Sequence, residues 1–135
     1  CVEWSYDYDL FNFNYQKDCT MKVHIDTGTI HSQYWSGGDW YADSYVKAFI
    51  SGTSAMSQAV ANDHSPEWES TLDMGCPSNE NATLNLQMFE DDTWEDDLMF
   101  TCAVTGWSEF DPTKTQICDG ITYDGGESLS HQILY

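Results

Sequence analysis

The chain has 135 residues, enough for a single domain with a hydrophobic core of its own. It carries 23 acidic residues against four lysines and no arginine, and its formal charge of −19 repels phosphate backbones and argues against binding to nucleic acid. No apolar run approaches the roughly 18 residues that a membrane-spanning helix needs.

The cysteines and one sequon indicate an oxidising compartment. The sequence begins at Cys1 instead of methionine, and its five cysteines form no CxxC pair, which argues against a zinc finger or a thioredoxin-like site. Asn81-Ala82-Thr83 is an N-glycosylation sequon, with Asn81 as the acceptor. Together these features predict a secreted protein, or an excised extracellular domain, that contains disulfides. The odd number of cysteines leaves one thiol free or paired outside the chain.

The first residues of the chain are rich in aromatic side chains that alternate with polar ones. The alternation changes phase between Tyr8 and Phe11, which indicates either one strand with a bulge or two short strands. The aromatic residues could form a carbohydrate or partner surface, but packing against the domain is favoured. We therefore expect residues 1–19 to be an N-terminal extension packed on a domain that spans residues 20–135.

The rest of the chain indicates strands. Apolar and polar residues alternate with a period of two, or β-forming residues gather, over 21–26, 45–50, 82–88 and 98–104. Gly, Pro, Asp and Ser pairs between these runs predict turns. Residues 54–61 fit either a helix or a loop beside a strand. Short strands separated by turns predict an all-β fold, an antiparallel β-sandwich.

Catalytic motifs are weak. Asp26-Thr27-Gly28 after an apolar strand resembles the aspartic-protease tripeptide, but no downstream strand has the supporting glycine, and a strand that ends in a turn explains it. The four histidines lack zinc-ligand spacing, and no Gly-x-Ser-x-Gly elbow is present. We therefore expect structural histidines and no enzymatic activity.

Two acidic clusters carry the functional signal. In the stretch from Glu90 to Asp97, six of eight residues are carboxylates, and Asp39 and Asp43 form a smaller cluster upstream. Closely spaced carboxylates repel each other unless a cation neutralises them, and calcium prefers oxygen ligands. A solvated acidic loop is the alternative for either cluster alone.

Three motifs, in this order, resemble the C2 domain family over about residues 20–120. The sequence Asp43-Ser44-Tyr45-Val46-Lys47, with Asp39 four residues earlier, is similar to the first calcium loop of that family. Residues 62–68 resemble its Asn-x-x-x-Pro-x-Trp turn, and residues 88–98 resemble its third loop. Glu90 stands where the family usually has an aspartate. The resemblance implies an eight-stranded antiparallel β-sandwich with these loops at one end.

Within the family the sequence looks most like the perforin type. The shared features are Gly38-Asp39 before the first loop, Trp94 before an acid pair, and cysteines after the following strand. The resemblance implies a disulfide between Cys102 and Cys118. Among the other three cysteines we expect one disulfide, with Cys1–Cys19 as the first choice and Cys19–Cys76 as the second.

The resemblance also assigns roles to individual residues. It implies that two calcium ions are held by carboxylates of the two acidic loops: Asp39, Asp43, Glu90, Asp92 and either Asp96 or Asp97, with Asp97 favoured. Asp91 should point outward. Three aromatic residues, Trp40, Tyr41 and Trp94, should lie at the loop tips and contact a membrane, and ordinary packing is their alternative role.

Two functions from different classes remain. The first is a secreted, calcium-dependent module that docks on phospholipid membranes, in which a larger pore-forming protein or a homo-oligomer is a possible partner. The second is an acidic, calcium-binding protein of an extracellular or mineralised matrix. Matrix acidity tends to be spread in repeats, whereas here the carboxylates concentrate in two loops, so the first function is favoured.

Overall fold

The computed structural model describes residues 21–30, 43–61, 63–77, 81–92, 94–119 and 128–134. In these residues the chain forms eight strands and one short 3-10 helix: β1 (Lys22–Thr29), β2 (Ser44–Ile50), β3 (Thr53–Met56), β4 (Glu67–Asp73), β5 (Leu84–Glu90), β6 (Asp97–Val104), η2 (Trp107–Glu109), β7 (Gln116–Asp119) and β8 (Ser128–Leu134). No helix in this part of the chain has the length and apolar character needed to cross a membrane.

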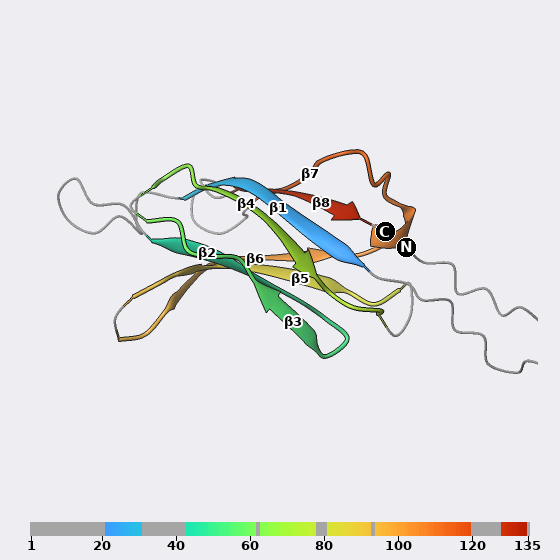
Figure 1. Cartoon of the computed structure of the whole chain (residues 1–135), viewed down its shortest axis with the longest axis horizontal. Coiled ribbons are helices and arrows are strands. Elements are labelled where there is room, and N and C mark those ends of the chain that lie inside the picture. The colour runs from blue at the N-terminus through green and yellow to red at the C-terminus, as the bar shows by residue number, and fades with distance from the viewer. Residues whose placement is uncertain are drawn as a thin grey trace, which may run out of the picture.

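The strands form two antiparallel sheets of four strands each. One sheet has the order β4-β1-β8-β7 and the other has the order β3-β2-β5-β6. Figure 1 shows them as two layers, with β1 and β4 in the upper layer and β2, β3 and β5 in the lower one. The predicted all-β, antiparallel sandwich is therefore confirmed.

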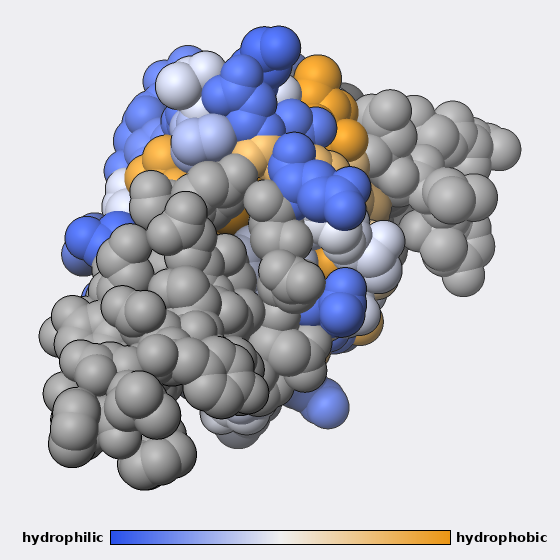
Figure 2. Space-filling view, turned by 90° about the vertical axis from the view of Figure 1, so that its right-hand side faces the viewer, coloured by the Kyte–Doolittle hydropathy of each residue, from blue (hydrophilic) through white to orange (hydrophobic). Residues whose placement is uncertain are grey.

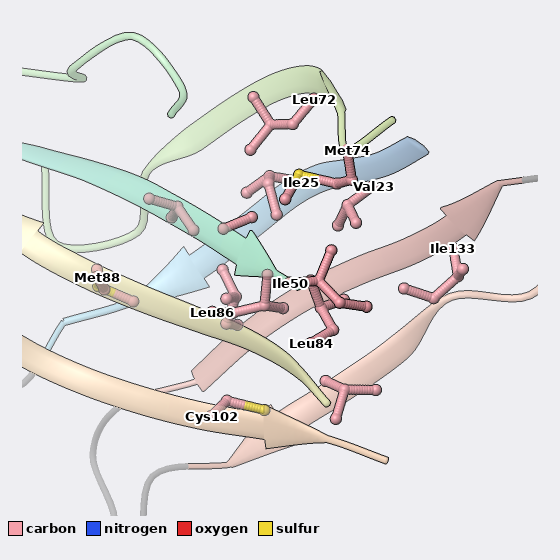
Figure 3. Packing of buried hydrophobic residues seen from close by; sticks show 14 of the residues in the cluster. Val23, Ile25, Ile50, Leu72, Met74, Leu84, Leu86, Met88, Cys102 and Ile133 are labelled. Atoms are coloured by element: carbon pink, nitrogen blue, oxygen red, sulfur yellow. The ribbon is translucent and has the colours of Figure 1, made fainter. Parts of the chain in front are cut away.

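The core lies between the layers and follows from the alternation in the sequence. On β2 the buried residues Val46, Ala48 and Ile50 alternate with partly exposed ones, and on β5 Leu84, Leu86 and Met88 do the same. In Figure 3 labelled side chains from the two sheets, among them Ile25 and Leu86, project into the space between the layers. Because a strand alternates its side chains between two faces, each run needs only one apolar face to build this core.

One disulfide joins the two sheets at their edges. Cys102 on β6 is bonded to Cys118 on β7, with 6.1 Å between the two Cα atoms. This pairing is as the resemblance implied. Cys76 is exposed and forms no disulfide, so the Cys19–Cys76 pairing is wrong. Cys1 and Cys19 lie outside the described residues, as does the N-terminal extension over residues 1–19.

Two local expectations were wrong, each for a physical reason. Residues 53–56 form strand β3, although 54–61 was expected to be a helix or a loop; β3 is an edge strand with mostly exposed side chains, so it shows no apolar alternation. Asp26-Thr27-Gly28 lies inside β1 and not in a turn. The register of β1 against β8 shifts between Ile25 and Gly28, so β1 has one extra residue there and bulges.

Candidate functional site: the acidic loop end

The predicted calcium loops meet at one end of the sandwich. Ser44, the first residue of β2, pairs with Glu90, the last residue of β5, and Glu90 pairs with Asp97, the first residue of β6. The β5–β6 turn, yellow to orange in Figure 1, therefore lies at the end where β2 begins. Figure 2 views the molecule from the opposite end, where hydrophobic residues show between hydrophilic ones.

The backbone beside Asp43 is held in place by the Pro-x-Trp turn. The indole Nε1 of Trp68, a residue only 6% exposed, donates a hydrogen bond to the carbonyl of Ser44 at 3.0 Å. The backbone groups of Ser44 and Val60 exchange two further hydrogen bonds of 2.9 and 2.8 Å. The Pro-x-Trp motif thus has a structural role, because it fixes the start of β2, directly after the predicted ligand Asp43.

Loop one and loop three are joined directly by their backbones. The backbone N–H of Asp91 donates to the carbonyl of Asp43 at 2.7 Å, immediately next to the Ser44–Glu90 pair. This bond extends the β2–β5 pairing one step into the loops. The two acidic clusters, which are far apart in the sequence, therefore share one rigid base.

Three of the predicted ligands act electrostatically on a fourth, Glu90. Partial burial raises the pKa of the Glu90 carboxyl, and the negative charges of Asp97, Asp92 and Asp43, in that order, raise it further. Each of these charges opposes ionisation of Glu90 because like charges disfavour the charged form. The four carboxylates come from both loops, so the structure brings Asp43 of the upstream cluster together with three acids of the downstream cluster in one negatively charged site.

Asp96 has a different position from its neighbour Asp97. Its Oδ2 accepts a hydrogen bond of 2.6 Å from the Tyr45 hydroxyl, and its Oδ1 accepts one of 3.1 Å from the backbone N–H of Asp92. The bond to Asp96, with partial burial, raises the pKa of Tyr45 to about 12. Asp96 therefore connects β2 to loop three through both of its oxygens.

This role of Tyr45 was not predicted from the sequence. Its ring stacks on Phe89 of β5, with 5.4 Å between the ring centroids, and this stacking directs the hydroxyl toward loop three. Alternation along β2 places Tyr45 on the face away from the core, but only the fold reveals which acid it meets. A single tyrosine far upstream of an acidic run is not a recognisable signal.

Two hydrophobic side chains are exposed in the same loop region. Trp94 is 94% exposed and Leu98, the second residue of β6, is 47% exposed. Trp94 therefore lies at the surface, as predicted. Asp39, Trp40 and Tyr41 lie outside the described residues, so their predicted roles remain predictions.

The predicted glycosylation site lies away from the loops. Asn81 is exposed and precedes β5, which starts at Leu84 and ends at Glu90 in the acidic site. A strand rises about 3.4 Å per residue, so the sequon lies roughly 20 Å or more from the carboxylates. A glycan on Asn81 would leave the loop end accessible.

The described residues thus form an antiparallel β-sandwich with carboxylates gathered at one end. The family model of the C2 domain matches residues 15–118, and the chain therefore belongs to the C2 domain family. This confirms the family predicted from the three loop motifs. The boundary of the match differs from the predicted domain boundary at residue 20.

Solved structures with the same fold come from several proteins. Human GIVD cytosolic phospholipase A2 has a TM-score of 0.69 at 21% identity, and the match covers 90% of this chain but 17% of the phospholipase. The C2 domain designated A of plant extended synaptotagmin 1 has a TM-score of 0.71 at 13% identity, and the match covers 90% of this chain and 96% of that domain. A calcium-bound structure of the paired C2 domains, A and B, of extended synaptotagmin 2 has a TM-score of 0.68 at 12% identity, over 84% of this chain and 44% of that one. A search among curated proteins gives no match.

Proposed function

We propose that this C2 domain binds calcium at its acidic loop end and, once loaded, docks on phospholipid membranes. The observation that carries the proposal is the convergence of Asp43, Asp92 and Asp97 on Glu90, whose pKa is raised by partial burial and by their charges. A calcium ion relieves this repulsion and finds there the carboxylate oxygens that it prefers. The paired C2 domains of extended synaptotagmin 2, which share this fold, bind calcium in their solved structure, and this supports the same ligand.

The ligand set follows from the hydrogen bonds. Asp43, Glu90, Asp92 and Asp97 bind calcium together with Asp39. Asp96 positions the loop, because Tyr45 and the Asp92 backbone already occupy one site on each of its oxygens. Asp97 therefore serves as the last ligand in preference to Asp96. Backbone carbonyls of the loops complete the six to eight oxygens that calcium takes.

The membrane contact relies on calcium and on the exposed apolar side chains. Two bound calcium ions add four positive charges and change the formal charge only from −19 to −15, so the loaded domain still repels anionic lipid over most of its surface. Trp94, with Trp40 and Tyr41, inserts shallowly at the polar–apolar interface, where aromatic side chains are favoured. We therefore expect binding to zwitterionic phosphatidylcholine vesicles, with little gain from phosphatidylserine.

The compartment and the partners belong to the same proposal. The disulfide between Cys102 and Cys118 is favoured outside the reducing cytosol, and the exposed Asn81 is accessible to glycosylation, so the domain acts as a secreted, non-catalytic module. The perforin-type likeness rests on Gly38-Asp39, Trp94 and this cysteine pair in the sequence, and a pore-forming partner or a homo-oligomer remains a prediction from sequence. The acidic matrix protein is the second candidate.

Vesicle sedimentation tests the proposal. Phosphatidylcholine vesicles should pellet the protein with calcium and leave it in solution with a chelator. Trp94→Ala should weaken pelleting without changing calcium affinity, whereas Ile117→Ala, at a residue that is 67% exposed on the edge strand β7, should change neither. Binding that survives chelation, or that requires phosphatidylserine, would contradict the proposed mechanism.

A matched pair of acid variants separates a calcium site from diffuse acidity. Asp92→Asn removes one of the charges that act on Glu90, whereas Glu95→Gln removes an exposed charge from the same loop that does not raise the pKa of Glu90. Calcium titrations should show a large loss of affinity for Asp92→Asn and a small one for Glu95→Gln. Equal losses would favour the matrix-type acidic surface.

A further inference from the structure

A second group of metal-ligating side chains lies on the outer face of the other sheet. His24 and Asp26 are two residues apart on β1, and Glu69 is on the neighbouring strand β4. One ligand atom from each of the three residues lies within 4.8 Å of the other two. His24 and Asp26 are half-buried, and Glu69 is exposed, so the group is open to solvent on one side.

The convergence comes from an irregularity in both strands. β1 and β4 lose register between Ile25 and Thr27, which pair with Ser70 and Glu67, so β4 has one extra residue opposite Asp26. Glu69 occupies this position with a φ of 44°, in the left-handed region that residues other than glycine seldom adopt. Bulges re-aim side chains, and here the bulge brings Glu69 toward His24.

Each nitrogen of the His24 ring has a defined neighbour. Nδ1 lies 2.9 Å from the hydroxyl Oγ1 of Thr71, the residue that pairs with His24 across the strands, and Nε2 lies 3.3 Å from the carboxylate of Glu69. A hydrogen bond at one ring nitrogen fixes the direction of the other, as it does for histidines that bind metals. Nε2 is thereby aimed at the centre of the group.

The third side chain is also positioned by a neighbour. The Ser130 hydroxyl on β8 approaches Oδ2 of Asp26 at 3.4 Å, from the strand on the other side of β1. Ser130 and Thr71 thus support the group from both flanking strands. The three ligand-bearing residues lie on regular or bulged strands and not on loops, which limits their movement.

The chemistry of this set differs from that of the acidic loops. One imidazole nitrogen and two carboxylates suit zinc and related transition metals, whereas calcium prefers oxygen ligands alone. With a neutral imidazole the group carries two negative charges, which a divalent cation balances. Three protein ligands and an open side leave the fourth tetrahedral position for water.

We propose that His24, Asp26 and Glu69 form a zinc site on the outer face of the β4-β1-β8-β7 sheet, separate from the calcium loops. The calcium ligands Glu90 and Asp97 belong to the other sheet of the sandwich, whose layers lie about 10 Å apart. Zinc and calcium therefore bind this domain at the same time and stabilise different sheets. The proposal gives His24 a role beyond the structural one expected from the sequence.

Zinc titration of the full chain with calcium at saturation tests the site, read out by competition with a chromophoric zinc chelator. His24→Gln should lower zinc affinity at least about tenfold, and Thr71→Val, which removes only the hydrogen bond to Nδ1, should lower it about tenfold. The control His64→Gln, at an exposed histidine on the β3–β4 connection, should leave zinc affinity unchanged.

The loop variant Asp92→Asn separates the two metals. It should lower calcium affinity and leave zinc affinity unchanged, whereas His24→Gln should do the reverse. Zinc affinity that falls with Asp92→Asn and is unaffected by His24→Gln would place zinc in the loops and overturn the proposal. Melting curves without metal check that each variant is folded, and a variant that fails this check is replaced by Glu69→Gln on the exposed side of the group.

Discussion

His131 makes the stability of this domain dependent on pH. It points inward from β8 between Leu129 and Ile133, is 1% exposed, and has no hydrogen-bond partner of ordinary geometry at either ring nitrogen. Burial lowers the pKa of the imidazole from 6.5 to about 4, although the backbone of Leu129 opposes this shift. The folded protein therefore resists protonation of this ring, because burial removes the solvation that a charge needs and no side chain among the described residues pairs with it.

The sign and the size of the effect follow from linkage. A folded pKa below the unfolded value means that the unfolded chain binds the proton first, so stability is lost as the pH falls below about 6.5 and the loss is complete below about 4. Each pKa unit corresponds to about 1.4 kcal/mol, which gives a total of about 3 kcal/mol. At pH 5 the loss should already be about 2 kcal/mol.

The assay is urea denaturation of the wild type and of His131→Met, both with calcium chelated, at pH 7.5 and pH 5. Met has a similar volume and no titratable group, so all remaining titratable groups contribute equally to the pH dependence of stability in both proteins. The variant should be more stable at pH 7.5, because two unpartnered polar atoms leave the core, and its advantage should grow by about 2 kcal/mol at pH 5. An advantage that does not change with pH would refute a buried, neutral His131.

Three further predictions concern the loop end and the disulfide. Tyr45→Phe keeps the stacking on Phe89 but loses the hydrogen bond to Asp96, so it should cost about 1 kcal/mol of stability and weaken calcium binding, measured by denaturation and titration. Glu90→Gln should stabilise the calcium-free protein at pH 7 but not at pH 3, because the raised pKa of Glu90 means that its ionised form destabilises the fold; it should also reduce the rise in Tm with calcium. Reduction of the Cys102–Cys118 disulfide, which joins residues 16 positions apart, should lower the free energy of unfolding by about 3 kcal/mol. An unchanged Tm under reductant would contradict this.

The strands that were predicted from the sequence all have one buried face. β1, β2, β5 and β6 all carry alternating or continuous apolar residues, and their predicted bounds lie close to the observed ones. β3 and β7 are short edge strands that expose Met56 and Ile117, so burial leaves little periodic pattern in them. β4 was not predicted because its extra residue at Glu69 disturbs the period.

The candidate sites also differ in how far they could be predicted from the sequence. Asp43 and Glu90 were identifiable because each lies in a local motif, where spacing along the chain reflects spacing in the fold. The group at His24 and Glu69 joins residues far apart in the sequence through a register shift and a positive φ, and neither feature leaves a local pattern. Likewise, Tyr45 meets Asp96 only because β2 and β5 pair in one particular register.

The base of the acidic loop end is held by hydrogen bonds that need no metal. The indole of Trp68 binds the Ser44 carbonyl, the Asp91 backbone binds the Asp43 carbonyl, and a tyrosine hydroxyl binds Asp96; none of these bonds joins two like charges. The repelling carboxylates of Asp43, Glu90, Asp92 and Asp97, in contrast, lie at or next to the strand ends. Removal of calcium should therefore leave the bases of the loops ordered while the tips near Trp94 move. Hydrogen exchange with and without calcium should show protection of Asp91 and Ser44 in both states, and loss of that protection on chelation would mean that the metal, and not the strand pairing, holds the two loops together.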